Sequence, residues 1–327
     1  MVAIDSTTAP FRSSNHSSYT SPYVGRFAPS PSGPLHYGSL VCALASFLDA
    51  RAQGGRWLLR MEDIDPPREM PGAQDAILRT LELHGLLWDG DLLRQSTRYS
   101  AYSAVLAELQ QHHLCYGCNC SRQRLQSLGG IYDGHCRLYP PPSTDAVALR
   151  LKASDLPAAY SDIPTTIHFD DALQGPQLEN LTALGDFVIH RKDGLFAYQL
   201  AVVVDDIAQG ITHVVRGSDL LDTTARQIYL FNLLGKPAPH YCHIPVVVDA
   251  KQQKLSKQNH APAVDDSTPT VNLWRAMGSL GLSPPTVLRN EQPHALLLWG
   301  IEQWVLDKVP RQRTIAKPPD ACVISRD

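Results

Sequence analysis

The sequence predicts an α/β protein that has a nucleotide-binding domain, an inserted cysteine-rich segment and a short helical C-terminal region. Three observations lead to this prediction. Residues 23–28 have the pattern of a buried strand, and a proline- and glycine-rich loop then leads into a helix. A second apolar strand, at residues 56–61, has charged residues at its C-terminal end. Cysteines then crowd into residues 115–136, where the strand and helix pattern changes.

The composition limits the kinds of protein that this chain can be. It has 327 residues, of which 43% are hydrophobic, enough for one large or two modest domains. It contains no apolar run long enough to span a membrane, so we expect no membrane association. The net charge is −3, so contact with nucleic acid requires a local basic patch. Seven cysteines, an odd number, do not indicate a disulfide framework and favour the cytoplasm.

The chain is expected to divide into five segments. Residues 1–21 are rich in serine and threonine and are expected to form a disordered extension. The two halves of the nucleotide-binding domain are expected at residues 22–114 and 185–250. The cysteine-rich insertion, residues 115–184, lies between them. Residues 251–327 contain a lysine-bearing loop and the helical C-terminal region.

The loop after the first strand is a candidate phosphate site. Three prolines and a glycine between Pro29 and Pro34 exclude regular structure. Ser39 is placed to cap a helix that ends at the glycines of residues 54–55. The start of that helix supplies N–H groups and a partial positive charge, and His36 lies in the same loop. An ordinary strand-to-helix turn with a surface histidine explains this stretch alone about equally well.

Charged residues follow the second expected strand. The stretch from Arg56 to Arg68 reads Arg-Trp-Leu-Leu-Arg-Met-Glu-Asp-Ile-Asp-Pro-Pro-Arg. Ligands of open α/β sheets bind beyond the C-terminal ends of the strands. Glu62 and its neighbours are therefore candidates for holding an ammonium group or a ribose. A solvated acidic loop is the alternative.

The remaining elements follow from apolar periodicity and turn residues. Pro71 is expected in the first turn of a helix, and Asp193-Gly194 is a hairpin signal. Asp219 is placed to cap another helix. The tail that contains Lys308, Arg311, Arg313 and Lys317 is expected to be a frayed, solvated end, in preference to an RNA contact. Helices are expected at residues 71–86, 97–113, 271–281 and 293–306, and strands at 146–152, 211–216 and 244–248.

The crowded cysteines are Cys115, Cys118, Cys120 and Cys136. In a reducing compartment such a cluster indicates zinc, which thiolates bind at about 2.3 Å. From the chemistry alone, three cysteines with His135 form the expected ligand set. Buried free thiols are the alternative. The pattern implies no open coordination position, so the expected role of the metal is structural.

The order of the motifs resembles that of the class I glutamyl- and glutaminyl-tRNA synthetases. The run Arg-Phe-Ala-Pro-Ser-Pro-Ser-Gly-Pro-Leu-His-Tyr-Gly-Ser from Arg26 is similar to their first signature, although Ser39 replaces the usual final histidine. Arg-Met-Glu-Asp-Ile-Asp-Pro-Pro-Arg from Arg60 is similar to the next. Lys-Leu-Ser-Lys-Gln from Lys254 resembles the second class I signature, Lys-Met-Ser-Lys-Ser. The resemblance extends from about Tyr23 to about Leu306.

This resemblance implies a class I synthetase-type Rossmann nucleotide-binding domain and places the site residues. Arg26 and Arg216 would each bind a carboxylate of glutamate, and Glu62 its ammonium group; which arginine binds which carboxylate is left open. The implied glutamate-binding residues are Arg26, Phe27, Ala28, Pro29, Ser30, Glu62, Tyr198 and Arg216. The implied ATP-binding residues are His36, Gly38, Ser39, Lys254, Ser256 and Lys257, of which His36 and Lys257 would be catalytic, with Mg²⁺ accompanying ATP.

A finer resemblance is to the glutamyl-Q tRNA(Asp) synthetases, a family of short paralogues. It implies Cys118, Cys120, Tyr132 and Cys136 as ligands of a structural Zn²⁺, with Cys115 or His135 as alternatives to Tyr132. The roughly sixty residues after the lysine loop are too few for an anticodon-binding domain, since domains usually have about 100–150 residues. The resemblance implies that a monomer attaches glutamate to queuosine in the anticodon of tRNA(Asp). A truncated glutamyl-tRNA synthetase that charges tRNA(Glu), or an inactive ATP- or RNA-binding paralogue, are the alternatives.

Overall fold

The computed structural model describes residues 22–255 and 261–318. The extension expected at residues 1–21 lies outside the described residues, and so do Ser256 and Lys257 of the lysine loop. Within the described part of the chain, no helix is both long and apolar enough to cross a bilayer.

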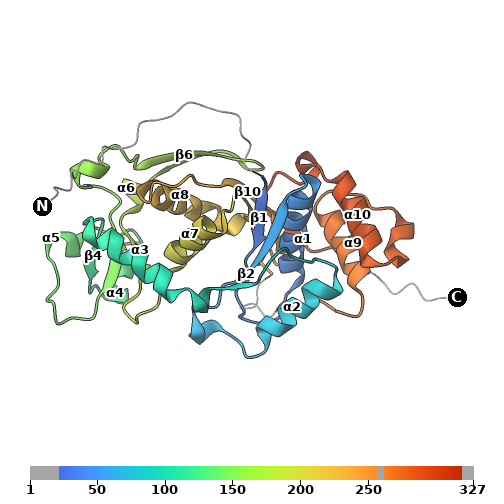
Figure 1. Cartoon of the computed structure of the whole chain (residues 1–327), viewed down its shortest axis with the longest axis horizontal. Coiled ribbons are helices and arrows are strands. Elements are labelled where there is room, and N and C mark those ends of the chain that lie inside the picture. The colour runs from blue at the N-terminus through green and yellow to red at the C-terminus, as the bar shows by residue number, and fades with distance from the viewer. Residues whose placement is uncertain (1–21, 256–260, 319–327) are drawn as a thin grey trace, which may run out of the picture.

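Parallel strands from the first half of the chain form one part of the central sheet (Figure 1). β1 (Val24–Phe27) pairs with β2 (Arg56–Met61), which pairs with the short β3 (Leu93–Arg94). α1 (Tyr37–Ala52) makes the crossover between β1 and β2. All four residues of β1 are buried, as expected for a parallel strand that is covered on both faces.

Strands from the second half of the chain form a four-stranded sheet of the order β7-β6-β10-β9. β9 (His213–Gly217) pairs in parallel with β10 (His240–Ile244), and β10 also pairs with β6 (Thr166–Asp171). β6 and β7 (Gly175–Asn180) form an antiparallel hairpin. The backbone N–H of Thr212 donates to the carbonyl oxygen of Val24 at 2.9 Å, so β9 runs beside β1. Two segments that lie 188 positions apart in the sequence therefore meet at β1 and β9.

The cysteine-rich segment lies at one end of the molecule, on the left of Figure 1. Its strands β4 and β5 form a small antiparallel sheet with β8, which follows the segment, in the order β4-β5-β8. The strands are β4 (Cys115–Cys118), β5 (Ala148–Leu151) and β8 (Phe187–His190), and the short helices are α4 (Arg122–Ser127), α5 (His135–Leu138) and α6 (Leu181–Leu184).

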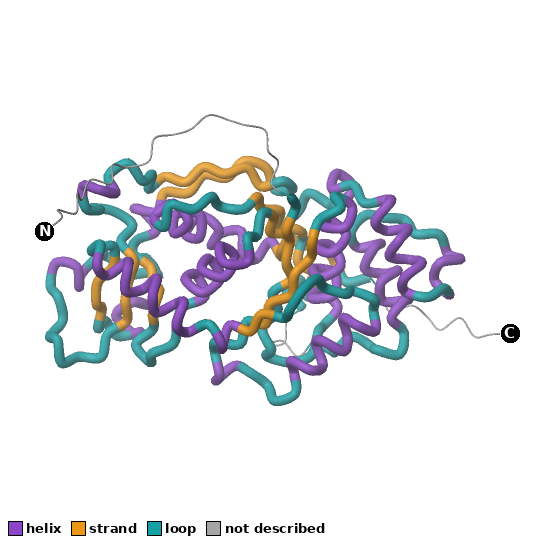
Figure 2. Tube along the Cα trace, viewed as in Figure 1, coloured by secondary structure: helices purple, strands orange, loops and turns teal. Residues whose placement is uncertain are grey.

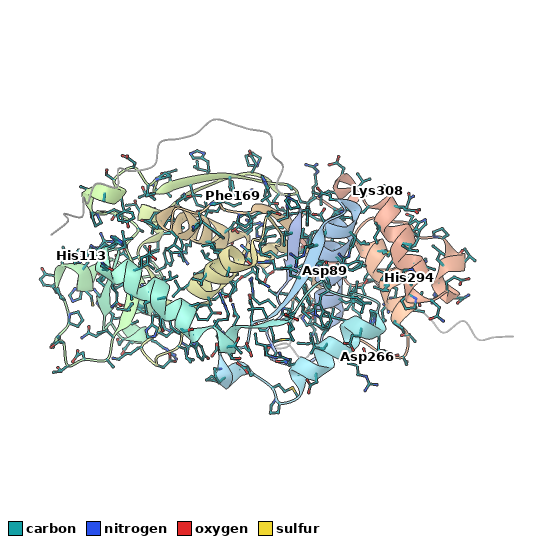
Figure 3. The ribbon with its side chains drawn as sticks, in the orientation of Figure 1. Asp89, His113, Phe169, Asp266, His294 and Lys308 are labelled. Carbon is teal, nitrogen blue, oxygen red and sulfur yellow. The ribbon has the colours of Figure 1, made fainter. Side chains whose placement is uncertain are left out.

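Helices cover the sheet and define two hydrophobic cores (Figures 1 and 2). One core joins α1 to β1, β2 and the C-terminal helices, and the other joins α3, α7 and α8 to β8. Figure 3 shows His113, just after α3, near one end of the molecule and His294, in α10, near the other. The helices are α2 (Ala73–Leu83), α3 (Tyr99–Gln111), α7 (Tyr198–Gln209), α8 (Thr224–Leu233), α9 (Pro269–Ser279) and α10 (Pro293–Gln303).

Three local expectations are wrong. His36, and not Ser39, is the N-cap of α1, because its ring accepts the hydrogen bond from the Ser39 N–H. Pro71 precedes α2, whose N-cap is Gly72 with φ of 76°, a left-handed conformation that favours glycine. Asp219 does not cap α8, since it lies in a 3₁₀ turn and pairs with Lys254.

The C-terminal part of the described chain is also more ordered than expected. The strand expected at residues 244–248 is two strands, because β11 (Val246–Val248) starts after β10 ends. β11 pairs in parallel with β12 (Thr314–Ala316), so this part of the basic tail is not a frayed end. Asp193-Gly194 does form the predicted turn, in which the Gly194 N–H donates to the Arg191 carbonyl oxygen at 3.1 Å.

Candidate functional site

Four predicted site residues meet at the C-terminal ends of the parallel strands. Arg26 lies in β1, Glu62 directly after β2 and Arg216 in β9, while Tyr198 is the first residue of α7. Burial raises the pKa of the Tyr198 hydroxyl, and the charges of Arg216, Glu62 and Arg26 all act on it. The Arg216 Nη1 lies 3.4 Å from that hydroxyl oxygen. The structure therefore brings together residues that are up to 190 positions apart, from Arg26 to Arg216.

Asp206, on α7, offsets two of the positive charges at this end of the sheet. Its Oδ1 lies 2.6 Å from the Arg60 Nη2 and 3.3 Å from the Arg26 Nε. All three side chains are almost completely buried. Sequence reasoning did not place Arg60 or Asp206 in the site. The signal was present, because Asp205-Asp206 interrupts an otherwise apolar helical run.

Glu62 has an unusual environment for a carboxylate. Its backbone N–H donates to the Pro29 carbonyl oxygen at 3.0 Å, which ties it to the loop after β1. Its side chain is 9% exposed, and its Oε1 lies 3.9 Å from the Arg60 Nε. Burial raises the pKa of Glu62 to about 7, although the charges of Arg60 and Arg26 act in the opposite direction. A bound ammonium group would stabilise its ionised form.

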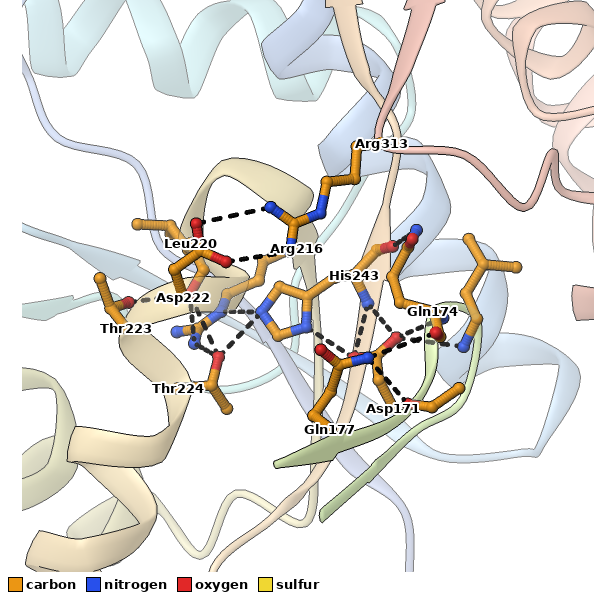
Figure 4. Close-up of polar contacts among 12 residues, drawn as sticks. Asp171, Gln174, Gln177, Arg216, Leu220, Asp222, Thr223, Thr224, His243 and Arg313 are labelled. Carbon is orange, nitrogen blue, oxygen red and sulfur yellow. Dashed lines mark hydrogen bonds and ion pairs between the residues drawn. The ribbon is translucent and has the colours of Figure 1, made fainter. Parts of the chain in front are cut away.

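Arg216 differs from Arg26 in its counterions. Neutral acceptors hold it. The Gln227 Oε1 lies 2.9 Å from Nη1. The Thr224 Oγ1 lies 2.8 Å from Nη2 (Figure 4). Among the residues that the structure describes, no carboxylate forms an ion pair with it. A buried guanidinium without a carboxylate is suited to receive one from a ligand.

The predicted phosphate loop is arranged around His36. Its Nδ1 accepts from the Ser39 N–H at 3.2 Å, and its Nε2 lies 3.0 Å from the Ser39 Oγ. A Cβ at Gly38 would lie 3.2 Å from the His36 ring, so glycine leaves room for this cap. Lys254, a predicted ATP-binding residue, pairs with Asp219.

The other predicted residues of the first signature differ in what they can contribute. The Phe27 ring stacks on Trp57 in the core, at 6.2 Å between ring centres, so its side chain cannot line the pocket. Pro29 contributes the carbonyl oxygen that accepts from Glu62. Ala28 is half-buried and Ser30 is exposed.

Three of the predicted metal ligands form a compact cluster. The sulfur atoms of Cys118, Cys120 and Cys136 all lie within 4.8 Å of one another. The Tyr132 hydroxyl oxygen lies 3.5 Å from the Cys118 sulfur and 3.7 Å from the Cys120 sulfur. Three thiols and one phenol thus converge on a common point, as a tetrahedral metal site requires. The donor set fits Zn²⁺.

The two alternative ligands lie elsewhere. His135 is exposed, and its ring packs on Tyr139 at 5.1 Å between ring centres. Cys115 belongs to the core around α3 and α7, where burial raises its pKa to about 11. The structure therefore does not bring together the set that chemistry alone favoured, three cysteines with His135: Cys136 is buried in the cluster, while its neighbour His135 is exposed.

Arg150 lies directly against the cysteine cluster. Its guanidinium is 3.9 Å from the centre of the Tyr132 ring. Burial raises the pKa of Cys118, but hydrogen bonds from Tyr132 and Arg150 lower it to about 7 overall. Arg150 was not predicted as a site residue, and its position in the middle strand β5 carried no signal of this role.

Comparisons with known proteins agree with this geometry. Residues 23–272 match the model of the family described as class I tRNA synthetases (E and Q), catalytic domain. A glutamyl-Q tRNA(Asp) synthetase of Ectopseudomonas mendocina (strain ymp) is 53% identical over 296 residues, which cover 90% of this chain and 97% of that protein. The chain belongs to the glutamyl-Q tRNA(Asp) synthetase family. Another member, from Serratia proteamaculans (strain 568), is 49% identical over 93% of this chain and 98% of its own length.

Solved structures confirm the predicted fold of this family member. A glutamate-tRNA synthetase from Elizabethkingia anophelis superposes with a TM-score of 0.75 at 23% identity, over 91% of this chain and 68% of that one. A glutamate tRNA ligase from Elizabethkingia meningosepticum CCUG26117 gives a TM-score of 0.73 at 24% identity, over 91% and 67%. The predicted class I synthetase fold is confirmed, and so is the family. The individual roles of the site residues stay predictions.

Proposed function

We propose that this protein activates L-glutamate with ATP and transfers it to the queuosine base in the anticodon of tRNA(Asp). The observation that carries the proposal is the meeting of Arg26, Arg216 and Glu62 at the ends of neighbouring strands. Two guanidinium groups and one carboxylate complement the two carboxylates and the ammonium group of glutamate. The near full-length match to proteins named glutamyl-Q tRNA(Asp) synthetase supports the transfer to that tRNA.

The first step joins glutamate to AMP. The α-carboxylate attacks the α-phosphorus of ATP, the bond to the β-phosphate oxygen breaks, and pyrophosphate leaves. Charge increases on the phosphate oxygens in the transition state, where each preorganised donor is typically worth about 10²–10³ in rate. His36 with Gly38 and Ser39 at the start of α1, and Lys254, Ser256 and Lys257 in the lysine loop, are the proposed donors. Mg²⁺ would arrive with ATP.

The second step consumes the mixed anhydride. A hydroxyl of the queuosine ring attacks the activated carbonyl carbon, AMP leaves, and an ester bond forms. Since the anhydride is already reactive, this step requires chiefly that the nucleophile be positioned. No side chain needs to form a covalent intermediate.

The cysteine cluster is proposed to bind a structural Zn²⁺. Cys118, Cys120 and Cys136 with Tyr132 supply four donors, which leaves no position for substrate. Zinc would hold β4, the following loop and α5 together, since these short elements have little core of their own. We also propose that the protein acts as a monomer in the cytoplasm, which light scattering and cell fractionation would check.

A charging assay with labelled glutamate tests the proposed function. Purified tRNA(Asp) is compared with and without queuosine, next to tRNA(Glu). Label that appears only on queuosine-bearing tRNA(Asp) supports the proposal. Label on tRNA(Glu) would instead identify a short glutamyl-tRNA synthetase. Absence of glutamate-dependent pyrophosphate exchange, in enzyme freed of RNA, would identify an inactive paralogue.

A further inference from the structure

Three buried side chains from three strands form a chain of hydrogen bonds that ends at Arg216. The His243 Nδ1, in β10, lies 2.6 Å from the Asp171 Oδ2, at the end of β6 (Figure 4). The His243 Nε2 lies 2.9 Å from the Arg216 Nε, in β9. The side chains of Asp171 and His243 are both 0% exposed. Solvent therefore cannot replace either contact.

The direction of each hydrogen bond follows from the chemistry of the end members. A guanidinium only donates, so the His243 Nε2 must accept from the Arg216 Nε–H. The ring proton is then on Nδ1, which donates to the Asp171 carboxylate. His243 is thus neutral and in a single tautomer. Burial lowers the pKa of His243, and the charges of Arg216 and Arg26 lower it further, whereas Asp171 raises it. Tyr241 stacks on the ring at 6.0 Å between ring centres.

Backbone hydrogen bonds hold Asp171, at the end of this series of hydrogen bonds farthest from Arg216. The Asp171 carboxylate also accepts from the His243 backbone N–H at 3.1 Å and from the Gln174 N–H at 2.8 Å. Burial raises the pKa of Asp171, but these hydrogen bonds and the one from the His243 ring lower it overall. The Gln174 side chain donates to the His243 carbonyl oxygen at 2.8 Å. The β6–β7 hairpin therefore clamps His243 on both its backbone and its ring.

This arrangement determines the plane of the Arg216 guanidinium. His243 holds the Nε of Arg216. The Gln227 Oε1, 2.9 Å from Nη1, and the Thr224 Oγ1, 2.8 Å from Nη2, each accept one hydrogen of a terminal nitrogen. The second hydrogens have only long contacts, 3.4 Å to the Tyr198 hydroxyl and 3.5 Å to the Leu220 carbonyl oxygen. The side of the guanidinium toward Tyr198 is the side on which a ligand carboxylate can bind.

We propose that Asp171 and His243 are positioning residues that orient Arg216 for one carboxylate of glutamate. The proposal rests on the function proposed above and assigns it two further residues, neither of which touches substrate. His243 supplies a lone pair that only the neutral ring has, and Asp171 keeps that lone pair facing Arg216. A misplacement of about 1 Å at such a group costs roughly 10² in rate.

A pair of substitutions separates orientation from packing. His243→Gln keeps an oxygen acceptor near the former Nε2, whereas His243→Asn keeps only a group near the former Nδ1. His84→Gln is the matched control, since His84 is also 0% exposed but bonds the Thr80 carbonyl oxygen at 2.7 Å in α2. Glutamate-dependent pyrophosphate exchange gives KM for glutamate, KM for ATP and kcat, and melting temperature monitors folding.

The expected result is selective. His243→Asn raises KM for glutamate about 100-fold, with KM for ATP changed less than about threefold, and His243→Gln recovers to within about tenfold of wild type. His84→Gln leaves both KM values unchanged. In ¹⁵N-histidine NMR spectra, His243 of the wild type shows the neutral Nδ1–H tautomer from pH 6 to 8. Asp171→Asn, which removes the charge that holds the ring, raises KM for glutamate.

Three results would overturn the proposal. In the first, the wild type catalyses exchange normally, but His243→Asn and His243→Gln have equal KM for glutamate. The acceptor at Nε2 would then be irrelevant, while the proposed function would stand. A wild type with no glutamate-dependent exchange would overturn both. An Nε2–H tautomer in the folded wild type would refute the positioning role directly.

Discussion

The Arg150 guanidinium lies 3.9 Å from the centre of the Tyr132 ring, and Tyr132 packs with Cys118 and Cys136. Arg150 is buried, and its Nη1 is held by the Asp186 carbonyl oxygen at 2.8 Å. Three thiolates and a phenolate around Zn²⁺ would carry a net charge of −2. A fixed cation beside Tyr132 and Cys118 offsets part of that charge.

Arg150→Met should therefore weaken zinc binding. A desolvated cation–π contact is worth about 2 kcal/mol, so we expect a loss of roughly tenfold or more in affinity. Competition with a chromogenic chelator measures this. Arg122→Met is the control, since Arg122 is an exposed arginine of the same segment. Equal zinc affinity in Arg150→Met and wild type would show that the cation does not act on the site.

Cys120→Ser should remove metal and stability together. Cys120 supplies one of the clustered sulfur atoms, 3.4 Å from the Cys136 sulfur. Metal analysis should give about one zinc per wild-type chain, and the variant should bind less and melt at a lower temperature. Cys115→Ser, outside the cluster, should keep its zinc. Metal-free wild-type protein with unchanged melting would contradict the structural role.

Glutamate binding should strengthen as pH rises through about 7. Burial raises the pKa of Glu62 to about 7 in the folded protein, and only its ionised form attracts an ammonium group. Below this pH the carboxyl is protonated, so KM for glutamate should increase as pH falls from 8 to 6. Glu62→Gln should have a high KM with no step near pH 7. Glu108→Gln, on the exposed face of α3, should keep the wild-type profile.

Glutamine should be a very poor substrate for activation. An amide side chain has no charge and one acceptor fewer than a carboxylate, which leaves a buried arginine partly unpaired at a cost of about 2–5 kcal/mol. That is roughly 30-fold to several-thousand-fold in kcat/KM. Arg26→Ala and Arg216→Ala should each abolish most of the exchange with glutamate. Arg216→Lys should not restore it, because lysine lacks the planar fork.

Pyrophosphate exchange with each amino acid makes this comparison. Arg311→Ala is a suitable control, because Arg311 is exposed and pairs only with Asp307 in the described part of the chain, at 2.7 Å. Activation of glutamine within a few-fold of glutamate would show that the pocket is wrongly assigned. So would wild-type efficiency in both alanine variants.

Much of the site was predictable because its signals are local. The loop after β1 is defined by neighbouring prolines and glycines, and the acidic run at Glu62 follows its strand directly. The cysteine spacing from Cys118 to Cys136 is likewise a property of one short segment. These patterns, in their order along the chain, were enough to predict the α/β fold and the family.

Other features of the site depend on the tertiary structure, because strand pairing brings residues that are distant in the sequence into contact. Asp171, Arg216 and His243 meet only because β10 pairs with both β6 and β9. No local pattern marks a buried aspartate that will face a histidine 72 residues later. Tyr132 lies near the cysteine sulfur atoms and His135 does not, and this depends on how α5 is packed. The sequence therefore determined which chemical groups are available, and packing determined which of them are neighbours, and with which charge and tautomer.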